Sequence, residues 1–153
     1  MAIFIRSGAP EDARVLTELS MRSKQSNGYD DAFMEACRDE LAVTPDLLRA
    51  HRHWIAQVGN SVCGCVCLAV DDDGAQGEVT TFFVDPAWQR KGVGRMLWET
   101  LLTCARALQL EALYLDADPF AVPFYEALGF GKIKDAPSGS IPGRTIPHMR
   151  FRL

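Results

Sequence analysis

The sequence predicts one α/β domain over residues 1–153, with a mixed, mostly antiparallel sheet of six or seven strands flanked by about four helices. Two observations indicate this class. Short segments rich in β-branched and aromatic residues alternate with amphipathic helical segments, in the order β-α-α-β-β-β-α-β-α-β-β. No linker, repeat or low-complexity tract divides the chain, and 153 residues with 48% hydrophobic content can bury a core as one domain.

The first fifty residues predict a strand followed by helices. Residues 1–6 are expected to form the first strand. Pro10-Glu11-Asp12 opens a helix, because proline and acidic residues favour the first turn, and Asn27-Gly28 ends it. A second helix begins with Asp30 or the following Asp31 as its cap, and a short third helix begins at Thr44-Pro45.

The centre of the chain predicts three strands. Residues 53–58 and 62–70 are β-type segments joined at Gly59-Asn60, which favours a tight hairpin turn. Asp71–Gly74 indicates the next solvated turn, and calcium binding is not expected there because no EF-type loop follows. Residues 78–84 are again rich in β-branched and aromatic residues.

The C-terminal half predicts a helical crossover between two strands. Apolar residues recur every three or four positions from Gly92 to about Leu110, which is typical of an amphipathic helix. Because this helix lies between strands 78–84 and 113–117, we expect those strands to run parallel. Residues 147–153 alternate in polarity and are expected to form the last strand.

Composition and charge exclude several classes of function. The formal net charge is −4 and the pI about 5.3, so a nucleic-acid or anionic-membrane footprint is not expected. No apolar run approaches the ~20 residues of a membrane helix. The N-terminus lacks the length and charge order of a signal peptide. The sequence therefore predicts a cytoplasmic protein.

The cysteines and histidines do not predict a metal or redox site. Cys63, Cys65 and Cys67 alternate along one strand, so their side chains are expected to share a face. Their spacing is neither a zinc knuckle nor a Cys-x-x-Cys pair, and we expect core packing in a reducing cytosol rather than an acyl-cysteine intermediate. His51 and His53 have no third ligand nearby in the sequence, so no metal is expected.

The most informative segment is the loop from Gln89 to Gly94, which joins a strand to a helix. The first amides of a helix have no internal partner, and the helix dipole adds partial positive charge there. Glycine lets a phosphate approach the backbone, and Arg90, Lys91 and Arg95 add formal charge. The segment therefore predicts a pyrophosphate site, with a plain structural turn as the alternative.

Two common phosphate loops are excluded by spacing. In a dinucleotide-binding fingerprint a third glycine or alanine would stand at position 97, which is Leu97 here. An ATP-type loop ends in Gly-Lys-Ser/Thr, and no such triplet occurs in the chain. What remains is Gln-x-x-Gly-x-Gly after a strand.

This pattern resembles the acyl-coenzyme A loop of the GNAT superfamily of N-acyltransferases. The family's late motif, Asn-x-x-Ala-x-x-Phe-Tyr-x-x-x-Gly-Phe, is matched in order and spacing by Ala121, Phe124, Tyr125, Gly129 and Phe130. Asp118 stands where many members have asparagine, which leaves an amide-specific contact with the cofactor open. The element order is also that of the family, so the resemblance covers nearly the whole chain.

The resemblance implies that acetyl-CoA is the co-substrate and that its pantetheine arm enters between strands 78–84 and 113–117, which diverge at their C-terminal ends. Backbone amides near the end of the first of these strands are the implied donors to the thioester carbonyl. The residues implied in binding are Phe83, Val84, Gln89, Arg90, Lys91, Gly92, Val93, Gly94, Arg95, Asp118, Ala121 and Phe124.

Transfer to an amine calls for a base and an acid. An alkylamine with a pKa near ~10.4 is protonated at neutral pH, and a positioned base removes that proton. Glu78 matches the general-base glutamate of the histone-acetylating branch of the family; a solvated glutamate at a strand entry is the alternative. Tyr125 matches the family's tyrosine beside the thioester sulfur, where its phenol can donate a proton; a core aromatic is the alternative.

The acceptor amine is the least determined part. In the family its pocket is built from the loop between the first two helices and from the last hairpin, here residues 24–31 and 137–144. The candidate acceptor-binding residues are Tyr29, Asp30 and His148, although acids at a helix start are usually caps. A peptide N-terminus, lysine, polyamine, amino acid or aminoglycoside all remain open, and so does a homodimer.

Two functions fit the sequence. The first is an N-acetyltransferase that moves an acetyl group from acetyl-CoA to a primary amine of a small molecule or peptide, by direct attack in a ternary complex. The second is a non-catalytic acyl-CoA-binding regulatory module with the same fold. Retention of Glu78 and Tyr125 favours the first.

Overall fold

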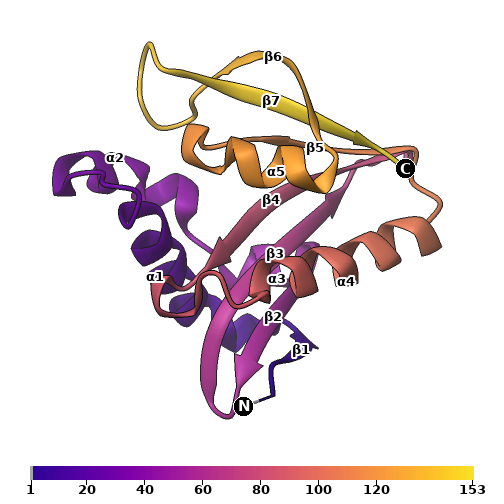
Figure 1. Cartoon of the computed structure of the whole chain (residues 1–153), viewed down its shortest axis with the longest axis horizontal. Coiled ribbons are helices and arrows are strands. Elements are labelled where there is room, and N and C mark those ends of the chain that lie inside the picture. Colours follow the sequence, from indigo (N-terminus) through magenta and orange to yellow (C-terminus); the bar gives the residue numbers. More distant parts are fainter. Residues whose placement is uncertain (1) are drawn as a thin grey trace.

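The computed structural model describes residues 2–153, in which one seven-stranded sheet has the order β1-β2-β3-β4-β5-β7-β6 (Figure 1). Met1, which was included in the expected first strand, lies outside the described residues. All neighbouring strands are antiparallel except β4 and β5, so the predicted mixed sheet is confirmed. The strands are β1 (Phe4–Ser7), β2 (Arg52–Val58), β3 (Ser61–Val70), β4 (Gln76–Val84), β5 (Ala112–Asp116), β6 (Gly131–Pro137) and β7 (Thr145–Arg152).

Five α-helices accompany the sheet in the described part of the chain, and none has the length and apolar character that a membrane span requires. In Figure 1, α1 and α2 lie together at the left, and α4 crosses the sheet at the right. The helices are α1 (Ala13–Gln25), α2 (Asp31–Leu41), α3 (Pro45–Ala50), α4 (Val93–Ala107) and α5 (Val122–Leu128). Short 3-10 turns at Pro10–Asp12, Pro86–Trp88 and Pro119–Ala121 precede α1, α4 and α5.

The sheet has a hydrophobic core on each face, because successive residues of a strand point to opposite sides. Ile55 of β2 packs with Leu16 and Leu19 of α1, whereas the neighbouring Ala56 belongs to the larger core that contains Leu97 of α4. These side chains have no exposed surface. The two cores fix the helices on either side of the strands that form the site.

The cysteines on β3 are buried free thiols, as expected of core residues, but Cys63 does not share a face with Cys65 and Cys67. Cys63 packs in the larger core with α4, and Cys65 packs in the smaller core with α1. The expectation of a common face is wrong for Cys63, because the pairing of β2 with β3 shifts register between Ala56 and Gln57, which places an extra residue in β3 and reverses the alternation there.

The feature that shapes the site is a fork between β4 and β5. The two strands pair in parallel only from Gln76 opposite Ala112 to Glu78 opposite Tyr114. Beyond that point β4 continues beside β3, and β5 continues beside β7. The predicted parallel pair and its divergence are therefore confirmed, with α4 as the crossover. Past Glu78, the edge of β4 that faces β5 has no strand partner within residues 2–153.

Candidate functional site

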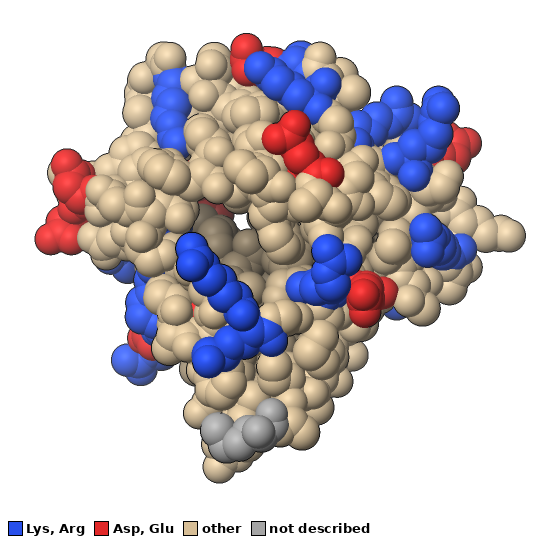
Figure 2. Space-filling model, viewed as in Figure 1, with Lys and Arg blue, Asp and Glu red and all other residues tan. Residues whose placement is uncertain are grey.

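A cavity of about 680 Å³ occupies this fork. In the space-filling view it is a hollow with Lys and Arg side chains at its rim (Figure 2). Its walls are the second half of β4, the loop before α4 with the first turn of that helix, the end of β5 and α5. Its other end is closed by α1, α2 and the loop between β6 and β7.

The start of α4 presents free backbone amides to this cavity. Gly92 is the N-cap residue with φ of 83°, a left-handed conformation that favours glycine. The first helical hydrogen bond is donated by the Met96 amide to the Gly92 carbonyl, so the amides of the preceding turn have no acceptor within the helix. Arg90, in the same loop, also has a left-handed φ of 62°, which is uncommon for a residue with a side chain.

Eleven of the twelve predicted cofactor-binding residues line this one cavity; the exception is Lys91. Gly94 shows why a small residue stands there. A Cβ added to Gly94 would lie 3.2 Å from Cζ of Phe124 and 3.7 Å from Cγ2 of Val84, so a side chain would fill the space between β4, α4 and α5. The spacing in the sequence thus identified a set of residues that the fold brings together.

Tyr125 lies on α5 at the wall of the cavity, where its side chain packs between aromatic neighbours. The ring centroids of Phe82, Phe124 and Phe130 are 6.1, 5.5 and 5.7 Å from that of Tyr125. No hydrogen bond from another residue in the range 2–153 reaches its hydroxyl. Burial, and secondly the charge of Asp118, raise the pKa of the Tyr125 phenol, so the hydroxyl keeps its proton at neutral pH.

Glu78 lies at the branch point of the fork, half-buried beside the cavity rather than in its lining. Burial raises the pKa of its carboxyl, and the carboxylates of Asp116 and Asp71 raise it further, against an opposing effect of His148. Asp116 does line the cavity, and its Oδ1 atom lies 2.7 Å from Nδ1 of His148. A base at Glu78 would therefore reach an amine in the cavity through Asp116 or a water molecule.

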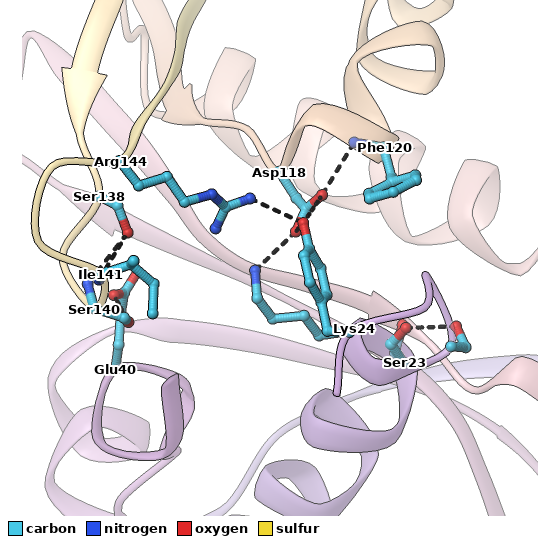
Figure 3. A network of polar contacts seen from close by, with 11 residues as sticks. Ser23, Lys24, Glu40, Asp118, Phe120, Ser138, Ser140, Ile141 and Arg144 are labelled. Atoms are coloured by element: carbon cyan, nitrogen blue, oxygen red, sulfur yellow. Dashed lines mark hydrogen bonds and ion pairs between the residues drawn. The ribbon is translucent and has the colours of Figure 1, made fainter. Parts of the chain in front are cut away.

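At the other end of the cavity, side chains from α1 and the α1–α2 loop contact Asp118, and a side chain of the β6–β7 loop joins them through Tyr29 (Figure 3). Lys24 Nζ is 2.8 Å from Asp118 Oδ2, and the Tyr29 hydroxyl donates to the same carboxylate at 3.0 Å. Arg144 Nη2 donates to the Tyr29 hydroxyl at 2.8 Å. The Phe120 amide also donates to Asp118, which caps the 3-10 turn before α5.

Asp118 is ionised in this setting. Burial by itself would raise the pKa of the carboxyl, but hydrogen bonds from Lys24, from the Phe120 amide and from Tyr29 hold it below the usual range. Its oxygens are acceptors for groups of the protein on three sides. The residue that stands where many family members have asparagine thus anchors a polar network at this end of the cavity.

The three predicted acceptor-binding residues lie around the cavity rather than in its lining. Tyr29 is hydrogen-bonded to two lining residues: its hydroxyl donates to Asp118 and accepts from Arg144. Asp30 is exposed and caps α2, accepting from the Phe33 amide at 2.8 Å, so its carboxylate is engaged as a helix cap. His148 is bonded to Asp116 on the neighbouring strand.

A sequence model of the Acetyltransferase (GNAT) family matches residues 15–130. The chain belongs to the GNAT acetyltransferase family. The matched segment contains α1, α2, the fork, the loop before α4 and the helix that carries Tyr125.

Related proteins agree with this assignment. This GNAT chain is 34% identical over 82 residues to the IAA acetyltransferase of Azospirillum brasilense. The aligned segment covers 52% of this chain and 54% of that protein. It is 27% identical over 143 residues to the mycothiol acetyltransferase of Propionibacterium freudenreichii subsp. shermanii. The aligned segment covers 92% of this chain and 40% of that protein. The chain therefore spans about half, or less, of the length of these curated relatives.

Solved structures share the fold. The PaiA N-acetyltransferase of Thermoplasma acidophilum, crystallised in complex with coenzyme A, superposes with a TM-score of 0.83 over 100% of both chains at 17% identity. At this identity the likeness establishes the fold alone.

Several lining residues of this GNAT domain were not identified from the sequence. Lys24 and Arg144 lie in the two loops expected to bind the acceptor, and Glu40 of α2 lies outside those loops. Glu40 accepts a hydrogen bond from Ser140, which links α2 to the β6–β7 loop at the closed end of the cavity. Residue types in these loops carry no periodicity or motif, so only the packing of the loops reveals which side chains face the site.

Proposed function

We propose that the protein is an N-acetyltransferase that moves an acetyl group from acetyl-CoA to a primary amine, by direct attack within a ternary complex. One observation carries this proposal. A single cavity joins the free amides at the start of α4, the unpaired edge of β4 and the side chain of Tyr125. These are the parts that a thioester donor with a pyrophosphate requires.

The donor would be held mainly by backbone groups. Its pyrophosphate fits the amides between Gln89 and Arg95, where the helix dipole and the side chains of Arg90 and Arg95 add positive charge. The edge of β4 beyond Glu78 leaves backbone amides and carbonyls that can pair with the amides of pantetheine. Amides near Val84 would then stabilise the oxyanion of the tetrahedral intermediate.

The chain supplies a base and a hydrogen-bond donor for the chemical step. Glu78 takes a proton from the attacking ammonium through Asp116 or a water molecule, and its raised pKa narrows the gap to the amine's pKa. The neutral nitrogen attacks the thioester carbon and the new C–N bond forms. As the C–S bond breaks, the extra proton on that nitrogen passes to the departing sulfur, which leaves an amide and a free thiol. A thiol with a pKa near ~8.5 is a stronger acid than the Tyr125 phenol, so Tyr125 stabilises the departing thiolate by donating a hydrogen bond as the proton arrives.

Release of free thiol from acetyl-CoA tests the proposal. The purified protein is mixed with acetyl-CoA and a panel of primary amines, thiol is followed by colour, and the N-acetyl product is identified by mass. We expect thiol release that depends on the amine and equals the product formed. Tight binding of CoA without release for any amine would instead favour the non-catalytic acyl-CoA-binding module.

A further inference from the structure

We propose that the acceptor of this enzyme is a small amine that also carries a carboxylate, and that Arg144 binds this carboxylate. The inference rests on the proposed function and names the class of its second substrate. It is carried by the contacts of Arg144 in the β6–β7 loop, compared with those of Lys24 at the same end of the cavity.

The two cations differ in how their charge is balanced. Lys24 is paired with Asp118, and only 13% and 15% of these two side chains are exposed. Arg144 lines the same cavity but forms no ion pair with a carboxylate among residues 2–153. Its hydrogen bond goes to the hydroxyl of Tyr29. The network of Lys24, Asp118 and Arg144 thus has one positive charge in excess.

Tyr29 cannot supply the missing negative charge. Burial raises the pKa of its phenol, and the neighbouring Asp118 raises it further, against the opposing effect of Arg144. Tyr29 is therefore a neutral partner at physiological pH. It serves to hold the guanidinium in place, because the bond from Arg144 is 2.8 Å long.

The aromatic rings beside Arg144 do not balance its charge either. Tyr29 and Phe33 are stacked with centroids 4.0 Å apart, and the Arg144 guanidinium carbon is 5.5 and 5.0 Å from these two centroids. A cation above an outer face of the stack would be much farther from one ring than from the other. Arg144 therefore lies at the rim of the stack, where the ring quadrupole offers little attraction.

A carboxylate of the acceptor would complete this arrangement. Arginine has five N–H donors in a planar fork, and a carboxylate accepts two of them side by side. The loop that presents Arg144 is itself fixed, since Ser138 donates its amide to the Arg144 carbonyl at 2.8 Å. A polyamine or an aminoglycoside would bring a second cation against the guanidinium, which is unfavourable. The acceptor is small because the same cavity must also admit the pantetheine arm.

Amines that differ only at the far end test this inference. We would measure kcat/KM by thiol release for three four-carbon amines that end in a carboxylate, a methyl group or a second amine: 4-aminobutyrate, n-butylamine and 1,4-diaminobutane. The same three kinds of amine would be compared at chain lengths of two to six carbons. A charge-assisted pair of hydrogen bonds predicts that the best amino acid exceeds its methyl-ended counterpart by ~10–100-fold. Arg144→Gln should abolish this preference, and Arg144→Glu should reverse it toward the diamine.

The variants have matched controls. Arg106→Gln removes the same kind of side chain from an exposed position on α4 and should keep the parental preference. Arg144→Lys, which keeps the charge without the fork, should retain part of the preference. Thermal melting and CoA affinity should be unchanged in all four variants, which separates loss of selectivity from loss of folding or donor binding.

The inference and the proposed function can fail separately. A parental enzyme that prefers the diamine, or an Arg144→Gln enzyme that keeps the carboxylate preference, would overturn the inference and leave acetyl transfer intact. If no amine releases thiol, the proposed function fails, and calorimetry of the amino acid series with the CoA-loaded protein then decides the inference. Binding that is lost in Arg144→Gln would support it, and absence of binding would overturn it.

Discussion

Lys24 of α1 and Asp118 before α5 form an ion pair at the cavity although they are 94 positions apart in the sequence. The pair joins α1 to the turn that precedes α5, the helix that carries Tyr125. It also fixes the carboxylate to which Tyr29 is bonded, and through Tyr29 the position of Arg144. The arrangement of side chains at the proposed acceptor end therefore depends on Asp118, whose side chain is mostly buried.

Replacing that acid should weaken both folding and selectivity. Asp118→Asn leaves Lys24 without its counter-charge, and we expect a loss of about 1–3 kcal/mol in the free energy of unfolding at pH 7, measured with denaturant. Asp46→Asn, which breaks the exposed pair with Arg49, is the control and should change stability little.

The effect of Asp118→Asn should depend on pH in a defined direction. The folded-state pKa of Asp118 is lowered, so its stabilisation is present above the unfolded value near ~3.9 and is lost as pH falls through the folded value. The difference between parent and variant should therefore be full at pH 7 and shrink in acid. A difference that stays constant down to pH 2 would show that the carboxylate charge does not contribute.

Gly94→Glu should abolish tight binding of CoA. The new side chain would meet Phe124, whose ring lies 3.2 Å from the position of the added Cβ, and would bring a negative charge to the predicted pyrophosphate site. We expect at least a ~10-fold rise in the Kd for CoA, measured by calorimetry. Thr103→Glu adds the same side chain to an exposed site on the same helix and should bind CoA like the parent. Parental affinity in Gly94→Glu would place the phosphates elsewhere.

Tyr125→Phe should lower kcat by ~10-fold or more while stability and CoA affinity stay nearly constant. The hydroxyl of Tyr125 has no hydrogen-bond partner in the described part of the chain, so its removal breaks no internal contact. Tyr114→Phe is the control. It should lower stability and leave kcat nearly constant, because the Tyr114 hydroxyl donates a hydrogen bond to Asp71 at 2.8 Å outside the cavity. A parental kcat in Tyr125→Phe, with chemistry limiting the rate, would leave that tyrosine as a packing residue.

Glu78→Gln should produce a defect in kcat/KM that is about 100-fold at pH 7 and becomes smaller at high pH. A base acts when it is deprotonated, so the parental rate should rise with pH through the raised pKa of Glu78. The variant depends instead on amine that is already neutral, and this fraction grows up to the amine's pKa near ~10.4. If Glu78→Gln had the same kcat/KM as the parent at every pH, deprotonation of the amine would be assigned to water or to His148.

The same variant should not lose stability. A carboxyl whose folded-state pKa is raised is penalised in its ionised form, and this penalty is present above the folded value and absent below the unfolded one. Glu78→Gln should therefore be as stable as the parent at neutral pH, or more stable, by chemical denaturation. A clear loss of stability would indicate a structural role for the glutamate.

Much of the fold could be predicted because its signals are local. The amphipathic pattern of α4 identified the crossover, and the crossover required β4 and β5 to be parallel. The turn at Gly59-Asn60 identified the β2–β3 hairpin, but it did not reveal the register shift after Ala56 that separates Cys63 from Cys65. A bulge depends on how two strands fit together, which a single strand's sequence does not record.

The candidate site also has one part that local sequence signals predict and one part that they do not. The loop at Gln89–Gly94 is one continuous segment, and its role as the start of a helix follows from neighbouring residues. The acceptor end is assembled from residues such as Tyr29 and Arg144, which are 115 positions apart, and from the departure at Asp118. No spacing rule connects such residues, so their association is known only from the fold.

Initial rates measured while acetyl-CoA and an amine are both varied test the central claim most directly. Direct attack in a ternary complex predicts that double-reciprocal plots intersect, with one N-acetyl product for each thiol released and no release without the amine. Parallel lines with a burst of thiol would contradict the account, because they would show an acetylated protein intermediate. Absence of thiol release with every amine, from a protein that binds CoA, would contradict acetyl transfer itself.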